Sequence, residues 1–367
     1  LPSCAFGATA LGGKPRGAPP AAGRSPFRDG CWAWVFPCNG GALMDQPDAD
    51  MAAVLCRIAE LRAGQADRYA LPFPAARAQL LAERRWWIDG APAMRSVDDF
   101  VVDTGPRRIR CRRYLPSDAQ AESPAAGTEL VYLHGGGWCV GSIDTHDGIM
   151  RALAQACRWP VTGIDYALAP EHPYPAATED VAEVLGQLRA THGRATRWVL
   201  AGDSAGANLA VGEAIRARDA GEPMPDALLL FYGIFYPLRD SASMRQFGDG
   251  RFGLSRRVLE RYDAAYFGPV ADPGRTAGSG TAPGELTGAD LGGLPPAWLA
   301  AAGLDPLRDD SVDLASALGA AGNACTLAVY RATVHGFLSY ARMLPAARAA
   351  FADAAAFVHR SLGAAGG

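Results

Sequence analysis

The sequence has 367 residues, of which 49% are hydrophobic and 20% are charged. That is enough to bury one large α/β core with an appendage. Its 35 basic and 38 acidic residues leave a net charge of −3 with no long run of either sign, which argues against nucleic acid or an anionic membrane surface as a partner. We therefore expect the ligand to be a small, roughly neutral molecule.

The sequence contains no pattern that indicates export or membrane insertion. No segment approaches the roughly 18 consecutive apolar residues of a membrane span, and the N-terminus lacks the basic and apolar regions of a signal peptide. The eight cysteines are scattered without a CxxC pair, several of them in apolar runs where a thiol packs as a small hydrophobe. The sequence predicts a cytoplasmic protein with reduced cysteines and no stable membrane insertion, and it leaves a homodimer open.

The first 43 residues differ in composition from the rest. They are rich in Gly, Ala and Pro and show neither helical nor strand periodicity, so we predict a disordered leader over 1–43. Met44 precedes the first amphipathic pattern, and we interpret it as the native start. Apolar residues then recur at three- and four-residue spacing over 50–64 and 74–88, which predicts two helices before any strand.

A β-hairpin is predicted next, over residues 97–114. Its two alternating segments flank the turn-forming Thr104-Gly105-Pro106. Short apolar runs typical of strands then alternate with helical stretches, at 129–134, 160–166, 198–203, 227–232, 297–303 and 325–330. This alternation predicts the α/β class, with a mostly parallel sheet covered by helices on both faces over 96–367.

One connection is too long for a simple crossover between strands. Between the strands ending near Tyr232 and starting near Ala297, residues 255–267 have a helical pattern, whereas 268–293 are rich in Gly, Pro and Thr. An insertion here, together with the two early helices, is a candidate for a lid over the strand ends.

The strongest local signal is the pentapeptide Gly202-Asp203-Ser204-Ala205-Gly206, which lies between an apolar strand and an alanine-rich helix. A G-x-S-x-G in this context predicts a nucleophilic serine on a tight strand-to-helix turn. Such a turn closes only if small residues stand two positions away on each side. The helix N-terminus after Ser204 also directs N–H groups and partial positive charge at a reacting carbonyl.

The second signal is the run His134-Gly135-Gly136-Gly137-Trp138, directly after another apolar strand. Consecutive glycines leave their backbone N–H groups unobstructed, so that several can converge on one oxygen, as an oxyanion hole requires. Ala205, which follows the serine, would supply a further N–H group. A phosphate-binding loop is disfavoured because no Gly-Lys-Ser/Thr follows, and His134 is interpreted as structural.

Two late residues complete a catalytic order. Asp305 follows the strand pattern AWLAAAGL, and His335 follows CTLAVY; the order Ser, Asp, His is the one used by α/β-hydrolases. Asp309 and Asp310 are nearby alternatives to Asp305, but they fall in the first turn of the next helix, where acidic residues commonly act as caps. No HExxH or paired-cysteine spacing indicates a metal site, so none is expected.

Together these blocks resemble the hormone-sensitive-lipase-like branch of bacterial carboxylesterases, with their HGGGW loop and GDSAG elbow. The segments DYALAPEHPYPAA at 165–177, DPLRDD around Asp305 and HGF at His335 extend the resemblance. It runs from about Leu55 to the C-terminus. Ala207 departs from the usual glycine, and the first 43 residues match nothing in the family.

The resemblance implies an ester hydrolase with Ser204 as nucleophile, His335 as base and Asp305 as the residue that orients the histidine. It also implies that Gly136, Gly137 and Ala205 provide the oxyanion donors, that Gly135 sets the loop, and that the helices in 44–95 and part of 236–290 form a cap. The candidate substrate-binding residues are Trp138, Asp203, Tyr236, Phe247, Phe252 and Leu254; each of these except Asp203 could equally belong to the core of the cap.

The expected substrate is a small ester with a short acyl chain, hydrolysed through an acyl-enzyme intermediate without a cofactor. The same residues could act on an amide, lactone or carbamate, since the triad is indifferent to the leaving atom. A ligand-binding receptor on this scaffold is the less favoured alternative, because such receptors have a broken triad and all three positions are intact here.

Overall fold

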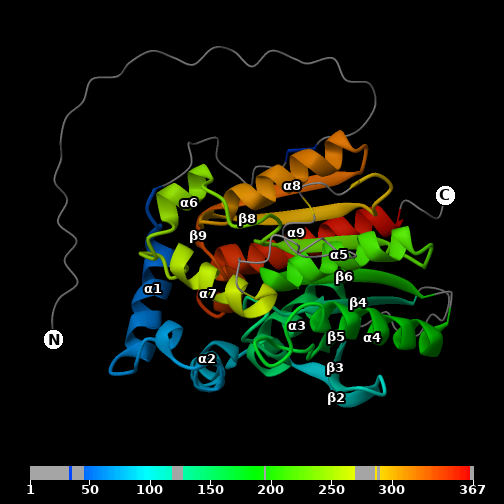
Figure 1. Cartoon of the computed structure of the whole chain (residues 1–367), viewed down its shortest axis with the longest axis horizontal. Coiled ribbons are helices and arrows are strands. Elements are labelled where there is room, and N and C mark those ends of the chain that lie inside the picture. The colour runs from blue at the N-terminus through cyan, green and yellow to red at the C-terminus, as the bar shows by residue number, and fades with distance from the viewer. Residues whose placement is uncertain are drawn as a thin grey trace, which may run out of the picture. The chain divides into compact units, whose positions relative to one another are not determined.

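The computed structural model describes residues 33–34, 45–117, 127–193, 196–268, 286 and 290–363, and every element named below lies in the compact unit Trp32–Gly367. Within these residues a nine-stranded sheet runs in the order β1-β9-β8-β7-β6-β4-β5-β3-β2 (Figure 1). The strands are β1 (Ala33–Trp34), β2 (Met94–Asp103), β3 (Arg108–Pro116), β4 (Thr128–Leu133), β5 (Val161–Ile164), β6 (Arg197–Asp203), β7 (Ala227–Phe231), β8 (Ala297–Leu304) and β9 (Cys325–Val334). Strand β3 pairs antiparallel with β2 and β5, and the other pairs are parallel. The predicted α/β fold with a mostly parallel sheet is confirmed.

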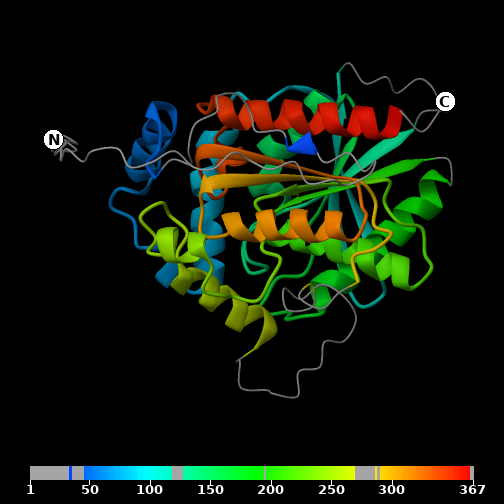
Figure 2. The ribbon, with the colours of Figure 1, turned by 90° about the horizontal axis from the view of Figure 1, so that it is seen from above.

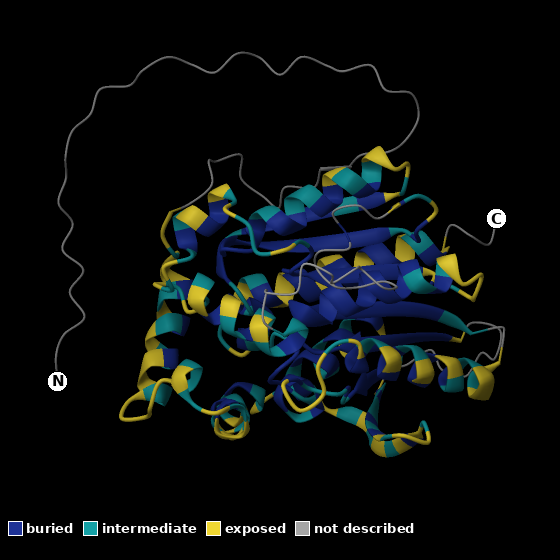
Figure 3. Cartoon of the chain, viewed as in Figure 1, coloured by how far each residue is buried: buried dark blue, intermediate teal, exposed yellow. Residues whose placement is uncertain are grey.

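Helices cover both faces of this sheet, and a hydrophobic cluster fills each face. Helices α4 (Ala176–His192), α5 (Ala205–Asp219) and α8 (Arg308–Ala320) belong to one cluster, and α3 (Ile143–Cys157) and α9 (Pro345–Gly363) belong to the other (Figure 2). The central strands β4, β5, β7 and β8 are buried along their whole length (Figure 3). Parallel strands covered on both faces require such continuous apolar runs rather than alternation.

Four further helices gather at one end of the sheet, on the left in Figure 1. They are α1 (Ala49–Arg62), α2 (Phe73–Ile88), α6 (Ala242–Phe247) and α7 (Arg256–Phe267). Their starts follow from local chemistry: Asp48 accepts from the Met51 N–H at 2.8 Å at the start of α1, and Ser255 accepts from the Val258 N–H at 3.3 Å at the start of α7. The early helices and the helix of the long connection thus lie close to their predicted ranges.

The predicted leader contains one described element. Residues Ala33–Trp34 form β1, which pairs parallel with β9, so the expectation of no regular structure over 1–43 is wrong for these two residues. The rest of the leader, Met44 and nearly all of 269–289 lie outside the described residues. Five cysteines fall in the described part and are free thiols there: Cys56, Cys111, Cys139, Cys157 and Cys325.

Candidate active site

The sheet brings the predicted residues to one edge. Ser204 directly follows β6, Asp305 follows β8, His335 follows β9, and the glycine run 135–137 begins two residues after β4. These four strands are parallel, so their carboxyl ends meet at the same edge, where open α/β sheets place their ligand sites. The edge therefore collects a hydroxyl, an imidazole, a carboxylate and a loop of exposed amides from distant parts of the chain.

Ser204 stands on a strained turn between β6 and α5. Its backbone has φ 53° and ψ −117°, which is unfavourable for a residue with a side chain. A Cβ on Gly202 would lie 2.4 Å from the carbonyl carbon of Gly206, and one on Gly206 would lie 1.9 Å from the Leu133 oxygen. Both glycines are therefore needed for the turn to close, as the sequence indicated.

Ser204, His335 and Asp305 form a continuous hydrogen-bonded row. His335 Nε2 lies 3.0 Å from Ser204 Oγ, and its Nδ1 lies 2.7 Å from Asp305 Oδ2. The other Asp305 oxygen accepts from the Leu307 N–H at 2.9 Å. An ionised carboxylate only accepts hydrogen bonds, so the proton of a neutral His335 belongs on Nδ1, and Nε2 is left to accept from the serine.

The aromatic surroundings of His335 restrict its ring. Tyr232, which follows β7 with φ 36°, packs its ring edge-on against the imidazole with 5.1 Å between the centroids. Asp305 is fully buried, and Ser204 is only 8% exposed. The histidine is thus fixed by a hydrogen bond on one nitrogen and by packing on its face, with Nε2 directed at the serine.

The glycine loop has the free donors that an oxyanion requires. Among the described residues, the N–H groups of Gly136, Gly137 and Ala205 donate no hydrogen bond. Gly136 has φ 128°, and a Cβ there would lie 2.0 Å from the Val140 oxygen, so no larger residue fits. Three unpaired amides beside the serine are an arrangement suited to stabilising a negatively charged oxygen.

Gly135 differs from its neighbours. Its N–H donates to Asp203 Oδ1 at 2.8 Å, and a Cβ on Gly135 would lie 2.4 Å from the other Asp203 oxygen. The amide of Gly135 is therefore occupied, so Gly135 takes no part in the oxyanion hole as a donor. Gly135 shapes the loop instead.

Asp203 is buried beneath this loop, so its predicted contact with substrate is wrong for this structure. Its Oδ1 also accepts from the Tyr132 hydroxyl at 2.7 Å, and His146 Nε2 lies 3.5 Å away. Burial alone would raise the pKa of Asp203, but the charge of His146 and the hydrogen bonds from His146, Tyr132 and Gly135 outweigh it and lower the pKa to about 2. The carboxylate stays ionised and anchors the loop.

His134 stabilises the other side of the loop in its neutral form. Its Nδ1 lies 2.9 Å from the Gly135 oxygen, and its ring stacks on Tyr166 with 4.2 Å between the centroids. Burial, with the neighbouring His146, lowers the pKa of His134 to about 3. His134 is thus a structural residue, in agreement with the interpretation from sequence.

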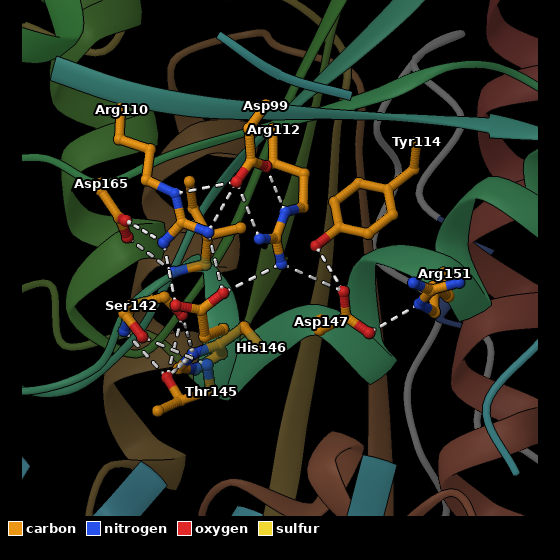
Figure 4. A network of polar contacts seen from close by, with 12 residues as sticks. Asp99, Arg110, Arg112, Tyr114, Ser142, Thr145, His146, Asp147, Arg151 and Asp165 are labelled. Atoms are coloured by element: carbon orange, nitrogen blue, oxygen red, sulfur yellow. Dashed lines mark hydrogen bonds and ion pairs between the residues drawn. The ribbon is translucent and has the colours of Figure 1, made fainter. Parts of the chain in front are cut away.

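A polar network fastens the β2–β3 hairpin to the start of α3, which carries His146 (Figure 4). Arg110 donates to Asp144 at 2.8 Å and to Asp99 at 2.9 Å, and Arg112 also contacts both carboxylates. An edge hairpin that is far from the serine in sequence thus helps to fix His146, which contacts Asp203.

Two of the predicted substrate-binding aromatics are packing residues. Trp138 is 1% exposed and stacks on Tyr266 of α7, and Phe247 is fully buried beside Phe252. The prediction that Trp138 and Phe247 contact substrate is therefore corrected: Trp138 packs between the glycine loop and α7, and Phe247 lies in the interior of the cap. Tyr236, Phe252 and Leu254 are half-buried, and their contact with substrate stays a prediction.

Asp309 and Asp310 lie in the first turn of α8, as predicted, but their side chains form hydrogen bonds with other segments. Asp309 accepts from the Ser243 N–H at 2.8 Å, and Asp310 accepts from the Phe235 and Tyr236 N–H groups at 3.0 and 3.3 Å. They hold the segment after β7 and the start of α6. Their side chains are thus bound away from His335.

We expect the stability difference between wild type and Asp310→Asn to depend on pH. Burial raises the pKa of Asp310 to about 6, opposed by the Phe235 and Tyr236 N–H groups and by the charge of Arg239. An unfolded carboxyl ionises near pH 4. The unfolding free energy of wild type should therefore fall by about 2 to 3 kcal/mol relative to that of the variant as pH rises from about 4 through 6. Urea denaturation of both proteins across this range measures it, and a constant difference would contradict the assignment.

Similarity to known proteins agrees with this geometry. The model of a family described as alpha/beta hydrolase fold matches residues 130–339. The chain belongs to this family. An alpha/beta hydrolase enzyme from the metagenome of Lake Arreo, Spain, is 32% identical, with a TM-score of 0.77 over 87% of this chain and 100% of the other.

Two esterases of known structure are similar over comparable lengths. A hyperthermophilic esterase from the archaeon Pyrobaculum calidifontis has 28% identity and a TM-score of 0.75, covering 84% of this chain and 98% of its own. A thermophilic and thermostable carboxylesterase from a metagenomic library has 31% identity and a TM-score of 0.73, covering 80% and 98%. The chain is thus an esterase-like α/β hydrolase.

Neither a metal site nor a membrane span is found in the described part of the chain. No three His, Cys, Asp or Glu side chains there are grouped so that they could hold a metal ion. None of its helices combines the length and apolar character needed to cross a bilayer.

Sequence reasoning missed several residues that support the site. Tyr132 and Tyr166 hold Asp203 and the His134 oxygen, and Arg77 of α2 donates to the Cys139 oxygen at 2.8 Å. A buried tyrosine hydroxyl usually needs a partner, so the tyrosines within buried strand patterns were the available signal. Nothing in the sequence pairs Arg77 with a carbonyl 62 positions away.

Proposed function

We propose that this protein is a serine carboxylester hydrolase of the hormone-sensitive-lipase-like branch, acting on small esters with short acyl chains. The observation that carries the proposal is the row Ser204, His335, Asp305, with 3.0 and 2.7 Å separations, beside the free amides of the glycine loop. Serine, imidazole and carboxylate in this geometry generate a nucleophile without a metal or cofactor.

The reaction proceeds in two similar halves. His335 Nε2 takes the Ser204 proton as Oγ attacks the ester carbonyl, and the N–H groups of Gly136, Gly137 and Ala205 stabilise the resulting oxyanion. His335 then gives the proton to the departing alcohol, leaving an acyl group on Ser204. Water, activated by the same histidine, releases the acid. Asp305 keeps the imidazole oriented and offsets its positive charge throughout.

A substrate panel tests both the bond and the chain length. We expect p-nitrophenyl acetate and butyrate to be hydrolysed with the highest kcat/KM, and the octanoate to be at least about tenfold slower, as a restricted acyl pocket requires. The matched butyranilide and γ-butyrolactone should react far more slowly than the butyrate. Faster turnover of the anilide or the lactone would replace the proposed substrate class while keeping the catalytic residues.

The receptor alternative has no support in the geometry, because the three residues are hydrogen-bonded in order rather than broken. Ser204-dependent turnover of any ester in the panel would exclude a purely ligand-binding role. Binding of an ester without turnover would instead favour it.

A further inference from the structure

Helix α7 of the cap packs directly onto the glycine loop. A Cβ built on Gly137, which has φ 58°, would lie 2.2 Å from Cδ2 and 2.5 Å from Cγ of Tyr262. Tyr262 itself is 8% exposed. The tyrosine ring thus occupies the space where any side chain at position 137 would stand.

The next two residues of the loop contact the same side of α7. Trp138 stacks on Tyr266 with 4.7 Å between the ring centroids and an interplanar angle of 4°, and Cys139 Sγ lies 3.8 Å from the Tyr262 carbonyl oxygen. Tyr262 and Tyr266 are four residues apart and therefore share one helix face. One turn of α7 covers three consecutive residues of the loop.

Trp138 shows that this packing imposes a conformation. It has φ 59°, which a bulky residue seldom adopts. Such a conformation persists only where the surroundings determine it, and the indole contacts the rings of Tyr266 and Phe267 of α7. The shape of the loop thus depends on the cap helix.

Residues 69–77, which include the start of α2, also contact α7 and the loop. Arg261 of α7 places its guanidinium 4.2 Å above the Phe73 ring and donates to the Tyr69 and Leu71 oxygens. Arg77 of α2 donates to the Cys139 oxygen. Two segments that are far apart in the sequence, α7 and residues 69–77, therefore contact the loop and each other.

We propose that α7 is a positioning element of the oxyanion loop and that Tyr262 is the residue through which it acts. Glycines have the greatest backbone freedom, whereas an oxyanion hole works only if its donors are already in place. A flat ring against Gly137 restricts that freedom without blocking the amide. The inference rests on the proposed ester hydrolysis and goes beyond it, since it gives the cap a part in catalysis besides substrate selection.

Three variants of Tyr262 test the proposal with p-nitrophenyl butyrate as substrate. Tyr262→Ala should lower kcat about 10- to 100-fold with KM changed less than about threefold, because donors are misplaced in the transition state. Tyr262→Phe keeps the ring and should match wild type. Tyr262→Leu should fall between them. Glu260→Ala, on the exposed side of α7, is the matched control and should be neutral.

An inhibitor that mimics the oxyanion distinguishes positioning of the donors from a merely structural role, because a structural role would leave its Ki unchanged. Ser204 Oγ adds to the carbonyl carbon of a butyl trifluoromethyl ketone, and the serine proton passes to His335. The negatively charged oxygen of the adduct then accepts from the loop amides. The Ki of the ketone should rise in Tyr262→Ala by the same factor as kcat falls.

Two results would overturn the proposal: a folded Tyr262→Ala protein with kcat within about threefold of wild type, or a loss confined to KM with the ketone Ki unchanged. Should the alanine variant fail to fold in a thermal-unfolding assay, the leucine variant decides by the same criteria. Wild-type turnover in the same assay tests the proposed function separately.

Discussion

Ser204→Ala is expected to lower kcat for ester hydrolysis by more than about a thousandfold. Oγ is the atom 3.0 Å from His335 Nε2, so its removal leaves the base without a nucleophile to activate. Water could attack in its place only without the covalent intermediate, and the loop amides alone retain a small fraction of catalysis. Burst and steady-state kinetics with p-nitrophenyl butyrate measure the loss, and residual kcat above about a thousandth of wild type would refute Ser204 as nucleophile.

A second serine provides a matched control for stability. Ser204 precedes α5 without a side-chain capping bond, whereas Ser241 precedes α6 and accepts from the Met244 N–H. We therefore expect Ser204→Ala to leave the unfolding free energy nearly unchanged and Ser241→Ala to cost about 1 kcal/mol while keeping activity. The opposite pattern would mean that Ser204 is a structural residue.

The fold could be predicted because its main signals are local. Strands such as β7 and β8 are uninterrupted apolar runs between helical patterns, and parallel strands need such runs. Ser204, Asp305 and His335 could be named because each follows a strand, and the carboxyl ends of parallel strands meet at one edge. The hairpin was equally local, since its turn residues lie between its two strands.

The role of Asp203 could not be predicted. Its neighbours in sequence are the nucleophile and a glycine, but its hydrogen bonds reach Tyr132 and Gly135, 71 and 68 positions away. The strained elbow turns Ser204 outward and leaves Asp203 beneath the loop. No spacing rule contains that geometry, so the position of Asp203 beside the serine does not distinguish a buried residue from one that contacts substrate.

The predicted substrate contacts of two aromatic residues were wrong for a different reason. Trp138 and Phe247 are large and apolar, and such side chains line pockets and fill cores equally well. The burial of Trp138 depends on Tyr266, which lies on a distant segment that only the tertiary fold brings to the loop. Composition therefore identified a cap rich in aromatic residues without separating its interior from its lining.

The second large effect is expected at Asp305. Asp305→Asn should lower kcat/KM at neutral pH by roughly three to four orders of magnitude. Leu307 donates its N–H to Oδ1 at 2.9 Å, so the amide oxygen of the new asparagine is held on that side. Its NH2 group then faces His335 Nδ1, where an acceptor is needed. The imidazole must place its proton on Nε2, and it can no longer accept the proton of Ser204.

Asp309→Asn and Asp310→Asn are the matched comparisons, measured beside Asp305→Asn under the same conditions. Each should change kcat/KM less than about tenfold, because these carboxylates support backbone groups after β7 and contribute mainly stability. Asparagine keeps one acceptor oxygen, which preserves part of the bond from Ser243 to Asp309 and from Phe235 to Asp310. A large loss at Asp309 or Asp310 with a mild one at Asp305 would transfer the orienting role to that residue, and the hydrolase assignment would stand.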